Sequence, residues 1–399
     1  RIELLGKHVD YAGGRSIVCA IDRGIAFAAA PQGDAVLCAT DALSGESREV
    51  PLQGESTLHG GDWATYIATV ARRVARDCPA ARTGVSIVFA SDLPAASGLS
   101  SSSALLIATF LALARANDWF DDSALGGMQR GRLTPSVLAE YLASVESGRT
   151  FAGSAGDAGV GTLGGSQDHT AMLCCRRDLL SRFGFLPTQR LEDIAFPAHL
   201  TLAVAFSGVH AAKTGDARDS YNRASRAAAE IVRIWQEQTG NRAVKSLRRV
   251  TESRGVPAVR AAIRLAHSAD FSADELLRRV DHFAVELDLH GAAAAALSEH
   301  DWPRFGDLVS RSQQAAEELL GNQVPETIEL TRLALRNGAL AASAFGAGFG
   351  GSVWALVSTG DAARFLERWR EAYGQQFPEP AASATFFASR PADAAHYIA

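Results

Sequence analysis

A loop rich in glycine and serine constrains the fold of this chain more than any other feature. The apolar segment before it, 83–90, is typical of a β-strand, and the segment after it, 102–117, has a helical pattern. A glycine permits a tight turn there, small serines let the backbone approach an anion, and the first N–H groups of the helix point at that anion. The sequence therefore predicts a strand–loop–helix unit that binds phosphate, with hydroxyls able to ligate Mg²⁺, although serines that only cap the helix remain an alternative. The loop residues concerned are Pro94, Gly98, Leu99, Ser100, Ser101, Ser102 and Ser103.

A second glycine cluster lies near the C-terminus and contains Gly346, Gly348 and Gly350. It formally matches the GxGxxG pattern of dinucleotide-binding proteins. That pattern follows a first strand and opens a helix, whereas this cluster leads into the strand-like segment 352–358. The context excludes the dinucleotide interpretation.

The opening segment concentrates polar chemistry within ten residues. It carries Arg1, Lys7, His8 and Asp10, and a glycine pair follows. Carboxylates and imidazoles pair well with vicinal hydroxyls, so this density suits the recognition of a polyol. Taken alone, the segment is equally consistent with a polar surface turn.

Composition narrows the class of protein. The 399 residues, 47% of them hydrophobic, favour two domains, and a net charge of -5 with scattered basic residues gives no reason to expect a nucleic-acid partner. Five irregularly spaced cysteines indicate a reducing cytoplasm, and no apolar run approaches the roughly 20 residues that span a bilayer. We expect a cytoplasmic protein, with a monomer favoured. Because the chain opens at Arg1 within a motif, we also expect further residues upstream.

Hydrophobic periodicity predicts interleaved strands and helices, hence α+β layers. A mixed segment, 185–196, has one proline inside it and a second directly after it. It is the candidate linker, which divides the chain into domains at 1–196 and 197–399. Strands are predicted at 16–30, 34–40, 83–90, 200–206, 352–358 and 384–388. Helices are predicted at 62–77, 102–117, 136–146, 219–237 and 361–373, with three more within 257–337.

Three motif segments follow one another along the chain: the opening segment, the serine loop and the C-terminal glycine cluster. In that order they resemble the signatures of the galactokinase branch of the GHMP kinases. The resemblance spans nearly the whole chain. It implies a two-domain fold, with an N-terminal domain like domain 2 of ribosomal protein S5, a ferredoxin-like C-terminal domain and an active site between them. It also implies ATP and Mg²⁺ as cofactors and a sugar as the phosphoryl acceptor.

The resemblance assigns roles to individual residues. Asp168 matches the catalytic base, and Arg1 matches an arginine near the anomeric oxygen. Glu146 resembles the Mg²⁺-ligating glutamate, with Ser102 as its companion. Without the family, a loop carboxylate that caps a turn is a better interpretation of Asp168 than a catalytic base. The residues expected to bind the sugar are Lys7, His8, Asp10, Gly165 and Tyr221.

Lys7 departs from the family, because galactokinases have a glutamate there that receives a sugar hydroxyl. A lysine only donates, so a substrate with a carboxylate suits it better than a neutral sugar, unless the side chain turns to solvent. Other departures are Ala96, Ser103 and His169, which stand for glycine, alanine and glutamine. The glycine-rich insertion 148–165 suggests a mobile lid.

We therefore expect ATP-dependent phosphorylation of galactose, or a related sugar, at the anomeric hydroxyl. One alternative is a GHMP kinase for another acceptor, such as a uronic acid, a heptose or a mevalonate-type alcohol. His8, Asp10 and Tyr11 favour a galactose-like sugar over the last of these. A second alternative is a non-catalytic sensor of sugar and ATP, against which the presence of both Arg1 and Asp168 argues.

Overall fold

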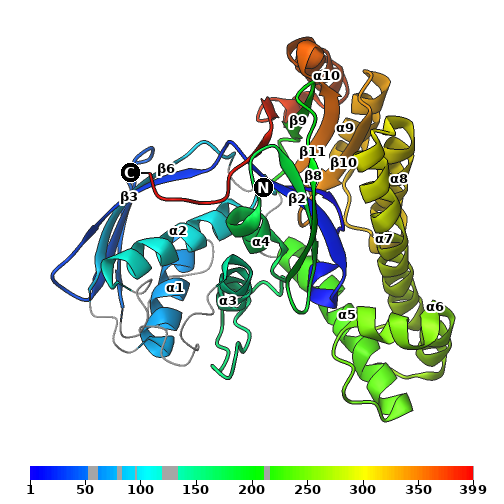
Figure 1. The fold of residues 1–399 in the computed structure, drawn as a ribbon, viewed down its shortest axis with the longest axis horizontal. Coiled ribbons are helices and arrows are strands. Elements are labelled where there is room, and N and C mark those ends of the chain that lie inside the picture. The colour runs from blue at the N-terminus through cyan, green and yellow to red at the C-terminus, as the bar shows by residue number, and fades with distance from the viewer. Residues whose placement is uncertain (53–61, 79–82, 95–96, 119–133, 211–215, 399) are drawn as a thin grey trace. The chain divides into compact units, whose positions relative to one another are not determined.

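The strand–loop–helix unit expected around the serine loop is present: β6 (Val85–Ser91) precedes the loop, and α2 (Ser101–Ala116) follows it. The structure is a computed structural model, which describes residues 1–52, 62–78, 83–94, 97–118, 134–210 and 216–398 (Figure 1). Ala95 and Ala96 of the loop lie outside the described residues. No helix of the described part is long and apolar enough to cross a lipid bilayer.

The chain forms two compact units, each assembled from three segments. Unit 1 comprises Arg1–Asp22, Ala96–Leu99 and Cys175–Ala394. Unit 2 comprises Arg23–Ala95, Ser100–Cys174 and Ala395–Ala399. The division between residues 196 and 197 concerns the two family domains and stays a prediction.

In the part of the chain that the structure describes, unit 2 is one sheet with four helices. The sheet order is β3-β6-β4-β5, in which β4 runs parallel to β6 and the other pairs are antiparallel. Its strands are β3 (Ile25–Pro31), β4 (Val36–Asp41), β5 (Ser47–Pro51) and β6. Its helices are α1 (Ala64–Asp77), α2, α3 (Pro135–Ser147) and α4 (Gln167–Cys174).

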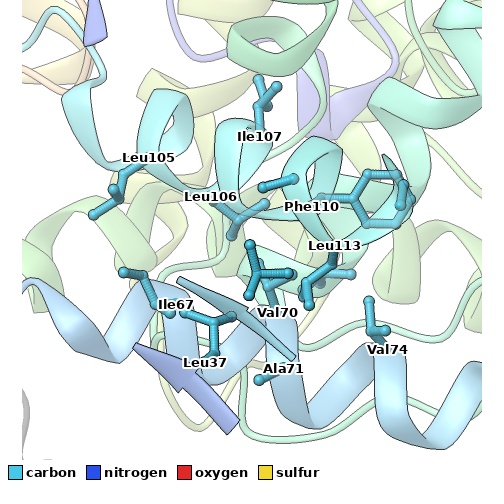
Figure 2. Packing of buried hydrophobic residues seen from close by; sticks show 14 of the residues in the cluster. Leu37, Ile67, Val70, Ala71, Val74, Leu105, Leu106, Ile107, Phe110 and Leu113 are labelled. Atoms are coloured by element: carbon cyan, nitrogen blue, oxygen red, sulfur yellow. The ribbon is translucent and has the colours of Figure 1, made fainter. Parts of the chain in front are cut away.

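The core of unit 2 lies where α1 and α2 pack on the sheet (Figure 2). Ile67, Val70 and Val74 are at spacings of three and four, so they share one helix face, and all three are buried. Figure 2 shows them near Leu106 and Leu113 of α2. This packing fixes α2, whose N-terminus carries the serines.

Unit 1 contains two antiparallel sheets. The first has the order β1-β2-β7-β8, with β13 added to β2, and the second has the order β10-β11-β9-β12. The strands are β1 (Ile2–Leu5), β2 (Arg15–Ile21), β7 (Leu179–Gly184), β8 (Gln189–Ala195), β9 (Leu200–Phe206), β10 (Ala341–Phe345), β11 (Ser352–Ser358), β12 (Thr385–Ser389) and β13 (Pro391–Ala392).

The helices of unit 1 make most of its remaining structure. They are α5 (Asp216–Thr239), α6 (Leu247–Leu265), α7 (Ala273–Glu299), α8 (Trp302–Ala315), α9 (Pro325–Arg336), α10 (Ala362–Gln376) and α11 (Pro378–Ala381). Short 3₁₀ turns η1 (Asp10–Ala12) and η3 (Thr359–Asp361) and the π-helical segment η2 (Ala316–Leu320) complete the set. One apolar cluster joins α5, α6 and α7 to the opening segment through Val9 and Tyr11.

Two predictions about local structure are wrong, and one alternative is excluded. The single strand 16–30 is two strands, β2 and β3, because the polar residues 22–24 interrupt it. The expected linker 185–196 contains β8, which pairs with β7 inside unit 1. The opening segment is not a surface turn, because residues 1–14 are all buried.

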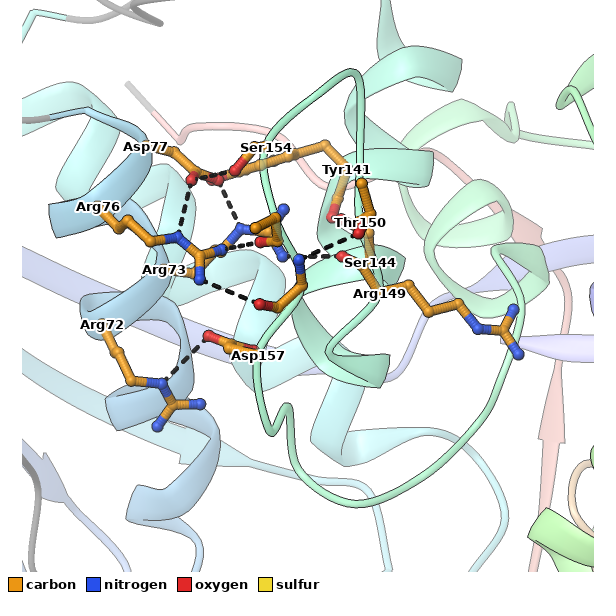
Figure 3. A network of polar contacts seen from close by, with 12 residues as sticks. Arg72, Arg73, Arg76, Asp77, Tyr141, Ser144, Arg149, Thr150, Ser154 and Asp157 are labelled. Atoms are coloured by element: carbon orange, nitrogen blue, oxygen red, sulfur yellow. Dashed lines mark hydrogen bonds and ion pairs between the residues drawn. The ribbon is translucent and has the colours of Figure 1, made fainter.

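The glycine-rich insertion lies against α1 (Figure 3). Arg73 Nη1 donates to the Arg149 carbonyl at 3.0 Å, and Arg72 Nε contacts the Asp157 carboxylate at 3.2 Å. Arg76 also donates to carbonyls of the insertion, those of Ala155 and Gly156. These bonds hold the insertion on a helix of its own unit, and the mobile lid stays a prediction.

Candidate active site

The three motif segments meet within unit 1. Arg1 Nη1 donates to the carbonyl of Gly98 at 3.0 Å, and its guanidinium lies 5.8 Å from the ring centre of Phe345. Gly346 approaches the serine loop so closely that a Cβ there would lie 2.8 Å from the Gly98 carbonyl oxygen. With φ at +83°, that position requires glycine for both reasons. Arg1, the loop residues 97–99 and the C-terminal glycine cluster therefore form one cluster, although 97 positions separate Arg1 from Gly98 and 255 separate Ser97 from Ser352.

Further hydrogen bonds fix the C-terminal glycine cluster. Ser352 Oγ donates to the carbonyl of Ser97 at 2.7 Å. Phe349 N donates to the Asn322 carbonyl at 2.6 Å, and a Cβ at Gly348 would lie 2.3 Å from that same oxygen. Gly350 has a φ of +119° and would clash with Val209 if it carried a side chain. Asn322 is buried and was not predicted from the sequence, because nothing marks an asparagine between two helices as part of a distant turn.

His8 links the opening segment to two other elements of unit 1. Its Nδ1 lies 3.0 Å from the Tyr11 hydroxyl, and its Nε2 lies 3.0 Å from the Ala347 carbonyl oxygen. Its ring centre is 5.1 Å from that of Tyr221 on α5. The structure thus brings together two of the predicted sugar-binding residues, and buried Asp10 lies two residues further along the chain, in η1.

Lys7 points elsewhere. Its side chain is 1% exposed, and its Nζ donates to Ser312 Oγ of α8 at 2.9 Å. The Lys7 side chain is therefore buried against α8 and is not turned to solvent.

A second cluster lies in unit 2, at the N-terminus of α2. Ser100 Oγ donates to the Asp168 carboxylate, and Ser103 Oγ donates to Glu146 Oε2 at 2.7 Å. His169 Nε2 lies 3.2 Å from the same Glu146 oxygen. Glu146 and His169 are buried, whereas Asp168 is half-buried. The sequence-predicted base and the predicted metal-binding glutamate thus both contact the serine loop.

Local structure explains why these side chains converge. Thr134 caps α3 by accepting a hydrogen bond from Val137 N, and Pro135 begins the helix. Gly148 ends α3 with a φ of +72°, so Glu146 lies in its last turn. Asp168 lies in the first turn of α4, where the helix dipole favours a carboxylate.

The remaining predicted residues are placed less specifically. Ser101 and Ser102 are half-buried in the first turn of α2, and Gly165 and Pro94 are half-buried in the loops before α4 and after β6. Leu99 is fully buried. Among the described residues no group of three or more histidine, cysteine or acidic side chains could hold a metal. The serine hydroxyl that donates to Glu146 is that of Ser103. Ser102 and Glu146 carry oxygen donors of the kind that Mg²⁺ prefers, and their pairing around the ion stays a prediction.

A polar stripe on α7 went undetected in the sequence. Arg279, His282, Glu286 and His290 recur at spacings of three and four, and all are buried. Arg279 Nη2 donates to the His8 carbonyl at 2.5 Å, and its guanidinium lies 5.6 Å from the Tyr11 ring centre. The helical spacing was the available signal, but charged side chains at that spacing are usually on a solvated face.

Models of three known families match separate parts of the chain. Residues 1–31 match the galactokinase galactose-binding signature, 65–165 the GHMP kinase N-terminal domain and 293–375 the GHMP kinase C-terminal domain. Galactokinase from Chloroflexus aurantiacus is 29% identical over 383 residues, which cover 94% of this chain and 86% of the relative. Galactokinase from Mycobacterium bovis is 28% identical, over 97% of this chain and 96% of the relative.

Solved structures show the same fold. Galactokinase from Lactococcus lactis, complexed with galactose, superposes with a TM-score of 0.78 at 19% identity and covers 100% of this chain and 93% of its own. A mevalonate kinase superposes with a TM-score of 0.55 at 14% identity, over 98% of this chain and 96% of its own. The expected two-domain fold of mixed helices and sheets is confirmed.

Proposed function

Because this chain belongs to the GHMP kinase superfamily, in its galactokinase-like branch, we propose that it transfers the γ-phosphoryl group of ATP to the anomeric hydroxyl of galactose or a closely related hexose. The observation that carries the proposal is the match of residues 1–31 to the galactose-binding signature. Within unit 1 that segment contacts both the serine loop, through Arg1, and the C-terminal glycine cluster, through His8.

ATP is assigned to the serine loop and the C-terminal glycine cluster. The N–H groups at the start of α2 supply hydrogen bonds and the favourable dipole end for phosphate oxygens. Because Gly346 has no side chain, the C-terminal glycine cluster packs directly on the serine loop, which supports assigning both segments to one ligand. The assigned residues are Pro94, Gly98, Leu99, Ser100, Ser101, Ser102, Ser103, Gly346, Gly348 and Gly350.

Asp168 is assigned as the base. Its carboxylate takes the proton of the anomeric hydroxyl as that oxygen forms a bond to the γ-phosphorus and the bond to the ADP oxygen breaks. Arg1 is assigned to stabilise the charge on the transferring group. Mg²⁺, held by Ser102 and Glu146, would neutralise charge on the phosphates.

The sugar is assigned to the opening segment and its neighbours, with His8, Asp10, Gly165 and Tyr221 as the contacting residues. The His8 ring is already fixed by Tyr11 and the Ala347 carbonyl, so it presents a preorganised polar group. Preorganisation of this kind supports recognition of one arrangement of hydroxyls.

The decisive experiment is a Mg-ATP turnover assay with a panel of monosaccharides: galactose, glucose, a heptose, galacturonate and, as a non-sugar acceptor, mevalonate. We expect ADP release that depends on galactose and a product with phosphate at the anomeric carbon. Preferred use of another acceptor would replace galactose in the proposal. Tight binding of sugar and ATP without phosphoryl transfer would leave the non-catalytic sensor as the function.

A further inference from the structure

Lys7 belongs to a buried chain of hydrogen bonds on the helices beneath the opening segment. Lys7 Nζ donates to Ser312 Oγ at 2.9 Å, and Ser312 Oγ donates to Glu286 Oε1 at 2.6 Å. The other oxygen of that carboxylate, Oε2, accepts from Gly6 N at 3.1 Å. Glu286 therefore contacts both the backbone N–H of Gly6 and the Ser312 hydroxyl, which accepts a hydrogen bond from the Lys7 ammonium.

All three side chains are sequestered from water. Lys7 and Glu286 are each 1% exposed, and Ser312 is fully buried. Burial raises the pKa of the Glu286 carboxyl, while the Lys7 ammonium and the bonds from Ser312 and Gly6 favour its charged form. A buried charge without a counter-charge is strongly unfavourable, so each member of this pair requires the other.

The residue type at position 7 is unusual for this chain. Only three of its 39 basic residues are lysines, at positions 7, 213 and 245. Lysine carries a compact ammonium on a flexible stem. Here that ammonium donates to Ser312 of α8, which donates in turn to Glu286 of α7.

The neighbouring residue is held by the same helix. His8 has a φ of +54°, a left-handed conformation rare for a residue with a side chain, and its carbonyl accepts from Arg279. Arg279 and Glu286 both lie on the buried polar stripe of α7. Arg279 donates to the His8 carbonyl, and Glu286 accepts from Gly6 N, so the two side chains hold the residues on either side of Lys7. The turn that carries His8 is thus anchored at three successive residues.

We propose that Lys7 is a positioning residue, which anchors this turn to α7 and α8 through Ser312 and Glu286 and does not contact the sugar. The inference rests on the proposed function and deepens it, since a lysine committed to the core offers no cation to a sugar carboxylate. The acceptor is accordingly a neutral hexose in preference to its uronate. Position 7 lies inside the galactose-binding signature, but its side chain supports the turn and does not bind the sugar.

A double-mutant cycle in thermal unfolding tests the anchor without using activity. The variants are Lys7→Met, Glu286→Gln and the double variant, with Lys245→Met at an exposed lysine as the control. Each single variant is expected to lower Tm by at least about 4 °C, and the double variant by clearly less than the sum. The control is expected to stay within about 1 °C. Additive losses would overturn the pairing of Lys7 with Glu286.

A second arm measures kcat/KM for galactose and galacturonate. We expect the wild type to prefer galactose at least tenfold, and the double variant to keep that ratio within about threefold, because neither residue contacts the sugar. A wild type that prefers galacturonate, or a folded double variant whose ratio changes more than tenfold, would overturn the inference. If the wild type phosphorylates no sugar, the proposed function fails, while the unfolding cycle still decides the role of Lys7.

Discussion

Ser100 has a left-handed backbone conformation that is unusual for a residue with a side chain. It precedes α2 at the N-cap position with a φ of +62°, yet its hydroxyl caps no helix N–H. That hydroxyl instead donates to Asp168, the proposed base. A left-handed conformation costs a residue with a Cβ roughly 1–2 kcal/mol, so a glycine would be the natural choice here. The hydrogen bond to the carboxylate is a physical reason for serine.

We expect Ser100→Gly to lower kcat by about tenfold to a hundredfold, because the base loses the donor that orients it. Stability should change by less than about 1 kcal/mol, since relief of the left-handed strain offsets the added freedom of glycine. The KM for galactose should stay within about threefold, because Ser100 is not among the residues assigned to the sugar.

His300→Gly is the matched control, because His300 also has a positive φ, +58°, at the end of α7. It should leave kcat unchanged. A rise in the KM for ATP in Ser100→Gly, with kcat intact, would show that Ser100 acts through the loop and not through Asp168.

At the scale of elements, α7 both packs in the core of unit 1 and holds the opening segment by hydrogen bonds. Its apolar residues Leu276, Val280 and Phe283 pack in one cluster with α5 and α6, while its polar stripe holds the opening segment. Two histidines of that stripe are buried beside arginines. Burial, Arg279, His8 and Lys7 lower the pKa of His282, and burial with Arg182 lowers the pKa of His290 to about 3.

Such histidines make stability depend on pH with a definite sign. Between pH 6.5 and pH 3 the unfolded chain takes up a proton at His290 that the folded chain refuses, so stability falls as pH falls. We expect His290 to contribute about 2 kcal/mol to the loss between pH 7 and pH 5.

The measurement is the unfolding free energy of wild type and His290→Asn at the two pH values. In the wild type, Arg182 Nε donates to His290 Nδ1 at 3.0 Å. The side-chain oxygen of asparagine can accept the same hydrogen bond, but asparagine does not titrate. The variant should lose about 2 kcal/mol less than wild type between pH 7 and pH 5. His267→Asn, at an exposed histidine, should keep the wild-type dependence, and an equal slope in His290→Asn would contradict the assignment.

Elements with strong periodicity could be predicted from the sequence, and elements decided by tertiary context could not. The segments 62–77 and 352–358 correspond to α1 and β11, because their apolar residues have a clear helical or continuous pattern. β8 was missed because its exposed polar residues and the nearby prolines resemble a linker. Its pairing with β7 outweighs that local preference.

The site divides in the same way. Arg1, His8, Asp168 and the glycines could be named from their motifs, and the structure brings them into two clusters. Glu286 and Ser312 could not, since only the fold brings α7 and α8 against Lys7, about 280 and 305 residues away in the chain.

At the scale of the whole molecule, one of the three motif segments is divided between the two units. The serine loop changes unit between Leu99 and Ser100, and Arg1 and Asp168 belong to different units. Ligands that bind residues of a folded unit stabilise it by mass action, by about 2.7 kcal/mol at a hundredfold excess over Kd. Binding and turnover therefore have separate readouts, and a variant can lose one without the other.

Asp168→Asn separates them. Asparagine preserves the size of the side chain and the acceptor for Ser100, but it takes no proton from the sugar, so kcat should fall by about 10² to 10⁴. The rise in Tm on adding galactose with a non-hydrolysable ATP analogue should match that of the wild type within about 1 °C. Asp288→Asn, at an exposed carboxylate on α7, should change neither quantity. If Asp168→Asn keeps full turnover, the base lies elsewhere; if both readouts are lost together, Asp168 supports the fold of its unit and its catalytic assignment loses its main support.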